Sequence, residues 1–286
     1  RRLRGAAYPS GVLRLPAFLA LAVALAGCGP SGTPVTLKFA ARIGGQPFAC
    51  NQSYAGVGSP ATTVLGGDFR FFVSQIRLVD DTGAEVPLTL DQDGTWQVMD
   101  LALLDFEDGT GLCREAGNSG THTVVTGRAP AGHYVGVHFT LGLPFEENLI
   151  DEATAPSPLN VSGMWWNWAG GHQFVRIDTR QGSATGNPFL VHVGNTGCQS
   201  IAGVPQSCNH VNTVDVTLMG VDPTTGTIVA DLARIAAGSD PTTNAPMSPI
   251  GCQSDIDDPD CAPVFSRIGL PFGTTPAGPQ QLFTME

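Results

Sequence analysis

The sequence predicts an all-β fold: a single antiparallel β-sandwich-like domain with long loops, one or two short helices and disulfide cross-links. Glycine and proline make up 36 and 22 of the 286 residues and recur along the chain, so most apolar segments between them are short. Short apolar segments bounded by turn residues are typical of strands. Residues 133–141 alternate, with Tyr134 and His138 expected on one face and Val137 and Phe139 on the other. This period of two predicts a half-buried strand.

The other elements follow from the same signals, in chain order. A turn at residues 80–83 ends a long apolar segment, and a proline-rich connection spans residues 144–158. An alanine-rich segment at residues 231–237 precedes Gly238 and predicts a short helix, and residues 263–268 predict another. We expect strands at residues 35–40, 69–79, 96–99, 121–126, 133–141, 163–168, 172–178, 189–193, 214–219 and 227–229. The sequence contains no internal repeat and no low-complexity linker, which favours one domain.

The N-terminal region has the features of an export signal. Four arginines precede or begin an apolar run that ends in Leu-Ala-Gly before Cys28. A basic region, a short apolar core and small residues before a cysteine are typical of a bacterial lipoprotein signal, and the run is too short for an ordinary transmembrane helix. We therefore expect residues 1–27 to be removed as a signal peptide. Cys28 would be lipidated, residues 28–34 would form a tether, and residues 35–286 would form the β-domain of a membrane-anchored lipoprotein facing the periplasm or the cell surface.

The charge balance argues against nucleic acid as a partner. The chain has 14 basic and 25 acidic residues. Removal of residues 1–27 takes away four arginines and no acid, which leaves 10 basic residues and a net charge of −15. Binding to phosphates needs clustered lysine and arginine, so no nucleic-acid partner is expected. An acidic surface keeps an exported protein soluble and attracts basic partners or cations.

Six cysteines remain beside the predicted lipid anchor: Cys50, Cys113, Cys198, Cys208, Cys252 and Cys261. An even number in an exported chain predicts disulfides, although six cysteines permit fifteen pairings. Proximity in sequence favours Cys198–Cys208 and Cys252–Cys261, which leaves Cys50 with Cys113. Metal thiolates are the less favoured interpretation, because no C-x-x-C pair is present.

A cluster of oxidisable side chains follows the proline-rich connection. Three of the four tryptophans, Trp165, Trp166 and Trp168, lie within four positions, shortly before His172 and His192. This density favours metal or redox chemistry over plain packing. The alternative, which the residues leave open, is that these aromatic side chains pack a core, as most aromatic residues on strands do.

Strand alternation gives the cluster a predicted geometry. Met164, Trp166 and Trp168 would share one face of their strand. On the next strand the shared face would carry His172, Phe174, Arg176 and Asp178. The Gly-Gly pair at residues 170–171 favours a hairpin between the two strands. Such a hairpin would stack tryptophan rings against an imidazole and a guanidinium.

Several motifs in this region match a known family. Residues 166–168 form a W-x-W motif, residues 171–174 match G-[YH]-x-F, and residues 192–198 match H-x-G-x-T-G-C. Further matching segments lie at residues 68–74, 103–109, 142–145, 156–160 and 258–261, with Cys113. Over roughly residues 35–270 the chain thus resembles the MbnP family, the four-cysteine half of the metallo-mystery pair, which is of the methanobactin-operon type.

The resemblance implies a copper-binding protein outside the cytoplasm. In this family a secreted di-haem partner of the cytochrome c peroxidase type, the MbnH type, is understood to oxidise a tryptophan to kynurenine, which helps to build the copper site. The chemistry is sensible, because an intact indole has only an N–H donor, whereas ring opening creates an amine and a ketone. The haem would carry the difficult chemistry and the protein would supply position.

The resemblance also indicates which residues form the site. Trp166 and Trp168 are the candidates for oxidation, and His192 is the strongest copper-ligand candidate because it lies in a matching block. Imidazole and thioether groups suit copper, so the other ligand candidates are His172, His138 and Met164.

One position departs from the family pattern. The family commonly has an Asn-His pair after Gly-x-Pro-Phe, whereas this chain has Asn148 followed by Leu149. If the missing histidine is a ligand, copper binding is weakened, lost, or rearranged with His172 as a substitute, since His172 stands where a tyrosine is frequent.

The sequence does not predict an enzyme. It contains no G-x-S-x-G elbow, no H-E-x-x-H and no P-loop. The acids Asp105, Glu107 and Asp108 lack the full EF-hand spacing and are more typical of a solvated turn. The main alternative to copper binding is a surface β-sandwich lipoprotein that binds a glycan or a protein through exposed aromatic residues.

Overall fold

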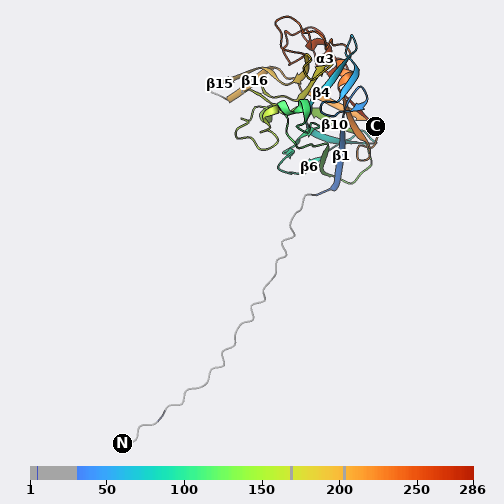
Figure 1. Ribbon diagram of the computed structural model, residues 1–286. Helices are drawn as coiled ribbons and strands as arrows, with labels where there is room; N and C mark the ends of the chain where they lie inside the picture. The colour runs from blue at the N-terminus through green and yellow to red at the C-terminus, as the bar shows by residue number, and fades with distance from the viewer. Residues whose placement is uncertain (1–4, 6–30, 168–169, 202–203) are drawn as a thin grey trace. The chain divides into compact units, whose positions relative to one another are not determined.

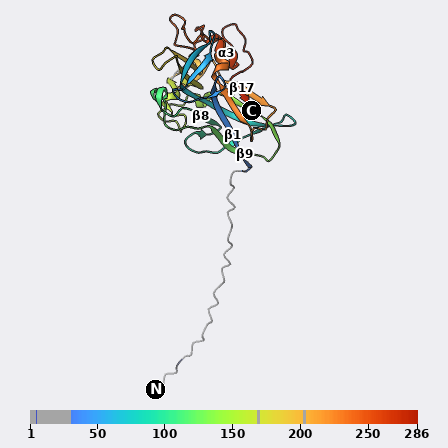
Figure 2. The same ribbon diagram turned by 45° about the vertical axis from the view of Figure 1, so that its right-hand side comes forward.

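Two β-sheets pack against each other around the long strand β4 (Thr62–Asp80). The computed structural model describes residues 31–167, 170–201 and 204–286, together with Gly5 (Figure 1). The smaller sheet has the order β19 (Phe283–Met285), β18 (Thr227–Asp231), β1 (Thr33–Ile43), β9 (Val124–Ala129) and β6 (Thr89–Leu90), with β2 (Gln46–Pro47) paired to β1. Figure 2 shows β1 alongside β9.

The larger sheet has the order β14 (Pro188–Val193), β13 (Val175–Gln181), β4, β10 (Tyr134–Leu141) and β17 (Val214–Met219). Also paired to β4 are β3 (Ser53–Val57), β5 (Glu85–Pro87) and β8 (Leu101–Asp105), and β7 (Gln97–Val98) pairs with β8. Two hairpins, β11 (Trp165–Asn167) with β12 (Gly171–His172) and β15 (Thr196–Ile201) with β16 (Val204–His210), lie outside these sheets. Figure 1 shows β15 and β16 at the edge of the body formed by residues 31–286.

Helical segments are few and short, as predicted. They are α1 (Phe145–Asn148), α2 (Leu232–Ala236) and α3 (Cys261–Ile268), with the 3₁₀ turns η1 (Gly111–Glu115) and η2 (Ser162–Met164). The Asp231 side chain caps α2 by accepting a hydrogen bond from the Ala233 N–H. Gly269 ends α3 in the left-handed conformation that glycine adopts readily. Within the described residues, no helix has the length and apolar character needed to cross a bilayer.

The all-β sandwich-like prediction is confirmed, with one correction. The pair β1–β18 is parallel, whereas the sequence predicted a wholly antiparallel domain. Parallel neighbours need a long connection rather than a tight turn. Strands β1 and β18 lie far apart in the sequence, so the intervening residues provide that connection and local turn signals do not reveal it.

Strand β4 is buried on both faces, and its buried charged side chains lie on one of them. Phe69 and Phe71 point into the main core between the two sheets. The alternating residues, which include Asp68, Arg70 and Phe72, point to the other face. There, loops and short elements cover a second apolar cluster made of Phe72, Leu101, Leu103, Leu143, Ala155, Leu159, Met164 and Phe174. The second face therefore combines an apolar layer with buried charged side chains.

The predicted alternation of β10 is correct over most of the strand and wrong at its start. Val137 and Phe139 are buried in the main core, and His138 is half-buried on the other face. Tyr134, predicted to share the face of His138, is instead in the main core. The register against β4 shifts between Tyr134 and Gly136. Such a bulge reverses which side chains point inward.

The three disulfides are those that sequence proximity favoured. Cys50 bonds to Cys113, Cys198 to Cys208, and Cys252 to Cys261. Cys198 and Cys208 lie directly opposite each other on β15 and β16. Disulfides persist in oxidising compartments outside the cytosol.

Candidate functional site

His192 combines burial with one free nitrogen. It lies on β14, opposite Arg176 of β13, and is 5% exposed. Its Nε2 atom is 2.5 Å from Asp178 Oδ1. Its Nδ1 atom is buried without a hydrogen-bond partner among the described residues. An ionised carboxylate only accepts hydrogen bonds, so Nε2–H donates, and in the neutral imidazole Nδ1 then carries the lone pair. A carboxylate on one ring nitrogen and a free lone pair on the other is the usual arrangement of a metal-binding histidine.

A chain of alternating charges leads from His192 across the second face of the larger sheet. Asp178 contacts Arg176 at 2.7 Å, and the Arg176 Nε atom lies 3.0 Å from Asp68. Asp68 in turn pairs with Arg70, which is fully buried. Burial opposes ionisation of Asp178, but the hydrogen bond from His192 and the positive charge of Arg176 lower the pKa of this carboxyl. Asp178 is therefore ionised and holds His192 in place.

The Trp166 ring lies against Gly194, shortly after His192 in the chain. A Cβ placed on Gly194 would lie 2.8 Å from the Cζ3 atom of the Trp166 ring, so the ring covers the Cβ side of Gly194. Gly194 follows β14 directly, two residues after His192. The Trp166 ring thus packs against the segment that follows His192 by two residues.

A cavity of about 630 Å³ opens beside the Trp166 ring. Its other walls include Asn195 and Thr196, which follow Gly194, together with His210 and Asp255. Thr196 lies directly opposite His210 in the β15–β16 hairpin. Trp166 is half-buried and borders this cavity, so a reagent or partner can reach it from solvent.

His172 is placed differently from the prediction. The predicted hairpin exists, with β11 paired to β12, but the residue opposite His172 is Trp165, whose ring meets the imidazole edge-on at 4.8 Å. The His172 Nδ1 and Nε2 atoms lie 2.7 and 2.8 Å from the carbonyl oxygens of Asn148 and Leu159. Burial lowers the pKa of this fully buried ring, against the opposing effect of those two contacts. Each ring nitrogen thus faces a backbone carbonyl oxygen, and the neutral ring donates to one of the two.

Two other predicted ligands lie away from His192. Met164 is fully buried in the second apolar cluster and belongs to η2 rather than to a strand, so strand alternation does not apply to it. His138 of β10 is opposite Arg77 of β4, and its Nδ1 atom is 2.7 Å from Glu85 Oε1. Seven residues of β4 separate Arg77 from Arg70, the residue that pairs with Arg176, which corresponds to roughly 20 Å. Trp168 and Cys28 lie outside the described residues.

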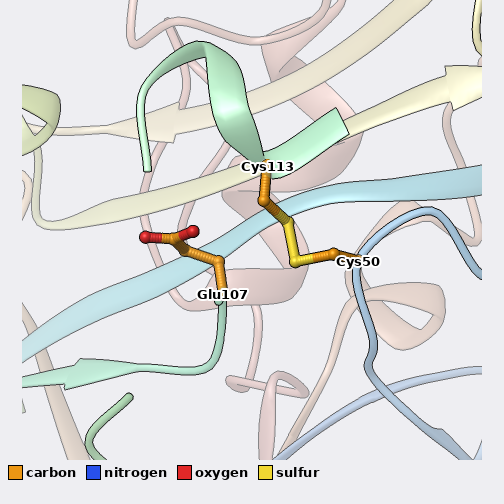
Figure 3. Close-up of side chains that lie close together, drawn as sticks. All are labelled: Cys50, Glu107 and Cys113. Atoms are coloured by element: carbon orange, nitrogen blue, oxygen red, sulfur yellow. A yellow bond between two sulfur atoms is a disulfide. The ribbon is translucent and has the colours of Figure 1, made fainter. Parts of the chain in front are cut away.

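A further group of metal-ligand atoms is formed by Cys50, Cys113 and Glu107 (Figure 3). The two sulfur atoms form a disulfide, so neither is a thiolate. The Glu107 carboxylate accepts hydrogen bonds from the Gly109 and Asn118 amides at 2.7 and 2.6 Å. This group therefore holds the η1 loop in place rather than a metal ion.

Comparison with known proteins identifies the family. The family model described as MbnP matches residues 32–254, which is most of the chain. The chain belongs to the MbnP family. Among solved structures, MbnP from Methylosinus trichosporium is similar, with a TM-score of 0.77 and 30% sequence identity over 88% of this chain and 98% of that chain. No curated protein sequence matches this chain.

In this member of the MbnP family, His172 lies close to Leu149, the position at which the sequence departs from the family pattern. His172 contacts Asn148, the residue next to Leu149, through both its backbone N–H and its ring Nδ1 atom. The imidazole thus stands beside the position where the family commonly has histidine. In the geometry described here its nitrogens face backbone carbonyl oxygens.

His210 is a candidate that sequence reasoning did not single out. It borders the cavity at Trp166, and no motif drew attention to it. The pairing of the cysteines could have indicated the position of His210. Once Cys198 and Cys208 are paired across an antiparallel hairpin, Thr196 and His210 must lie opposite each other two positions further along.

Proposed function

We propose that this MbnP-family chain is an exported copper-binding protein whose site is built from His192 and from an oxidised product of Trp166. The observation that carries the proposal is a buried His192 whose Nδ1 atom has no hydrogen-bond partner among the described residues, two positions before the glycine that the Trp166 ring covers. Imidazole nitrogen suits copper. Ring opening of Trp166 would add an amine and a ketone beside the imidazole.

The side chains present fit a copper ion at one defined atom. Asp178 fixes the tautomer and orientation of His192, and Nδ1 is the atom left to coordinate. His210 offers a second imidazole across the cavity from Trp166. His172 would contribute only after giving up its contact with Asn148 or Leu159, and Met164 would have to leave its apolar cluster.

We propose a binding role rather than catalysis for the chain itself. A di-haem partner of the cytochrome c peroxidase type, with peroxide as the oxidant, would cleave the indole C2–C3 bond of Trp166 to give N-formylkynurenine, and hydrolysis would release formate and leave kynurenine. The half-buried ring at the edge of a cavity is accessible for that reaction. An oxidising compartment suits the three disulfides. Anchoring through a lipid on Cys28 would keep the protein at the membrane without a spanning segment.

Peptide mass spectrometry and copper titration test this function together. The chain is produced with and without an active di-haem partner, and we expect a kynurenine product at Trp166 only in the first case, accompanied by tighter copper binding. Trp165→Phe, at the neighbouring position, should still be modified at residue 166, whereas Trp166→Phe should not gain copper affinity.

Two histidine variants separate the site from general metal binding. His192→Ala should abolish the tight copper site, and His138→Ala, which lies on a remote part of the sheet, should leave it unchanged. Tight, stoichiometric copper binding that persists in His192→Ala would refute the assignment, as would intact tryptophan at position 166 after treatment with a partner shown to be active.

A further inference from the structure

Arg70 is a buried cation with an unused donor group. The whole side chain is inaccessible to solvent. Its Nε atom donates to Asp68 at 2.9 Å, and Nη2 donates to Asp68 and to the Ala116 carbonyl oxygen. Nη1 has no hydrogen-bond partner among the described residues, since Glu107 Oε1 is 4.0 Å away. A buried donor left unpaired destabilises a fold by about 1–3 kcal/mol, more when it is charged, so an acceptor for Nη1 is expected.

A cavity of about 350 Å³ begins at this guanidinium. Gly163 and Gly117 form part of its wall. A Cβ at Gly163 would lie 2.9 Å from Arg70 Nη1, so a side chain at this position would cover the free donor. Glycine here leaves no side chain between Nη1 and the cavity. The volume lies within the range of small-molecule sites.

The opposite wall contains an aromatic ring that is held rigidly. Trp96 borders the cavity, and its ring is stacked on His122 with an interplanar angle of 4° and a centroid distance of 5.4 Å. Ser157, also in the wall, donates to the Thr95 carbonyl oxygen. The cavity therefore pairs a fixed apolar surface with hydroxyl, amide and guanidinium groups, a combination that suits ligands with both apolar and polar faces.

The surrounding charges decide between an anion and a neutral ligand. Four carboxyl groups, those of Asp68, Asp105, Glu107 and Asp178, lie along the network that contains only the two guanidinium groups of Arg70 and Arg176. The carboxyl groups outnumber the guanidinium groups, so this region does not attract an anion. An uncharged oxygen can still accept a hydrogen bond from Nη1.

We propose that this cavity binds a neutral saccharide, with a sugar ring against Trp96 and a hydroxyl oxygen accepting a hydrogen bond from Arg70 Nη1. Sugar hydroxyls both donate and accept, which matches the carbonyl, amide and hydroxyl groups of the wall. The site uses none of the groups assigned to copper, so a result that contradicts one of the two proposals leaves the other unaffected.

The test is a titration of the full, isotope-labelled chain followed by amide and indole N–H nuclear magnetic resonance signals. The probes are glucose, galactose and N-acetylglucosamine, with sodium acetate as the anionic probe. We expect one of the sugars to shift the Trp96 indole signal and the Gly117 and Gly163 amides saturably, with a Kd on the order of 1 mM. Shifts with acetate alone, or no saturable shift with any of these sugars, would overturn the proposal.

Two variants block the cavity in different ways, and a third is the control. Gly163→Ala places a methyl group over Nη1, and Ser162→Phe fills the cavity from an exposed position in its wall. Each should weaken sugar binding at least tenfold. Gly132→Ala, an exposed glycine on a distant loop, should bind as the wild type does. If Gly163→Ala misfolds, Ser162→Phe decides alone, and unchanged affinity in a folded Ser162→Phe chain contradicts the site.

Discussion

At the residue scale, the sequence singled out His192 as a ligand candidate but could not identify what holds it. The block at residues 192–198 marked His192 as a ligand candidate. Asp178 entered only as a member of a predicted strand face, because its contact with His192 depends on the register between β13 and β14. The sequence also does not show that the ring nitrogens of His172 and His192 have different surroundings. One has both nitrogens occupied by backbone carbonyl oxygens, and the other keeps one free.

The contact between Asp178 and His192 predicts the effect of Asp178→Asn. The amide cannot hold Nε2–H as firmly as a carboxylate, so the tautomer that leaves Nδ1 free is no longer enforced. We expect copper affinity to fall by about 10–100-fold, measured by competition with a coloured copper chelator. Nitrogen chemical shifts of His192 in the metal-free chain should show protonated Nε2 in the wild type. Glu115→Gln, which alters an exposed pair with Arg180, is the matched control, and equal losses in both variants would contradict the role of Asp178.

A second residue-scale prediction concerns pH and Asp105. Burial, together with the negative charge of Glu107, raises the pKa of Asp105 to about 7 despite Arg70. In the unfolded chain the same group titrates near pH 4, at about its ordinary pKa. Between these values the folded protein binds a proton that the unfolded chain has released, so the free energy of unfolding decreases as pH rises from about 4 to about 7.

Asp105→Asn should remove this contribution. Urea titrations across that pH range give the unfolding free energy of the wild type minus that of the variant. This difference should decrease as the pH rises, with a slope of at most about 1.4 kcal/mol per pH unit. Taking the difference cancels the opposite effect of His172, whose pKa is lowered. A pH-independent difference would show that Asp105 ionises normally in the folded state.

At the element scale, prediction succeeded where a strand is bounded by turns and buried on one face. The segments that became β1, β10, β14 and β17 were found in this way. It failed for β8, whose five residues are all buried and show no alternation, and for the β15–β16 hairpin, whose composition resembles a loop. It was partly right for the strand predicted at residues 172–178, which is interrupted between β12 and β13.

The disulfides differ in what they stabilise at this scale. Cys50–Cys113 closes a separation of 63 residues next to the buried charges, whereas Cys198–Cys208 closes 10 residues in a half-exposed hairpin. Chain entropy gives about 4 kcal/mol for the first loop and about 3 kcal/mol for the second. We expect the double variant Cys50→Ala/Cys113→Ala to lose more unfolding free energy than Cys198→Ala/Cys208→Ala in chemical denaturation. The second variant should instead be cut faster by protease within residues 196–210, and the reverse order of stabilities would contradict this account.

At the scale of the whole molecule, one strand joins two cores. The sequence predicted a sandwich with one buried interior. The structure adds a second covered face on the larger sheet, where the charged network, the second apolar cluster and both proposed sites lie. That face could not be predicted from periodicity, because the loops that cover it have no repeating pattern. Since neighbouring residues of β4 point into the two cores, neither core can lose β4 without affecting the other.

The shared strand predicts cooperative unfolding of both faces. Phe72→Ala removes a fully buried ring from the second cluster and should lower the unfolding free energy by about 3–5 kcal/mol. The described tryptophans lie on or beside the second face, so their fluorescence reports on it, while far-ultraviolet circular dichroism reports on the sheets. We expect both probes to give the same denaturation midpoint in wild type and variant, as in a two-state transition. Phe71→Ala, in the main core, should shift both midpoints together as well. A fluorescence transition that precedes the dichroism transition in Phe72→Ala would mean that the second face opens alone, and that the proposed copper and saccharide sites rest on a layer that unfolds independently of the sandwich.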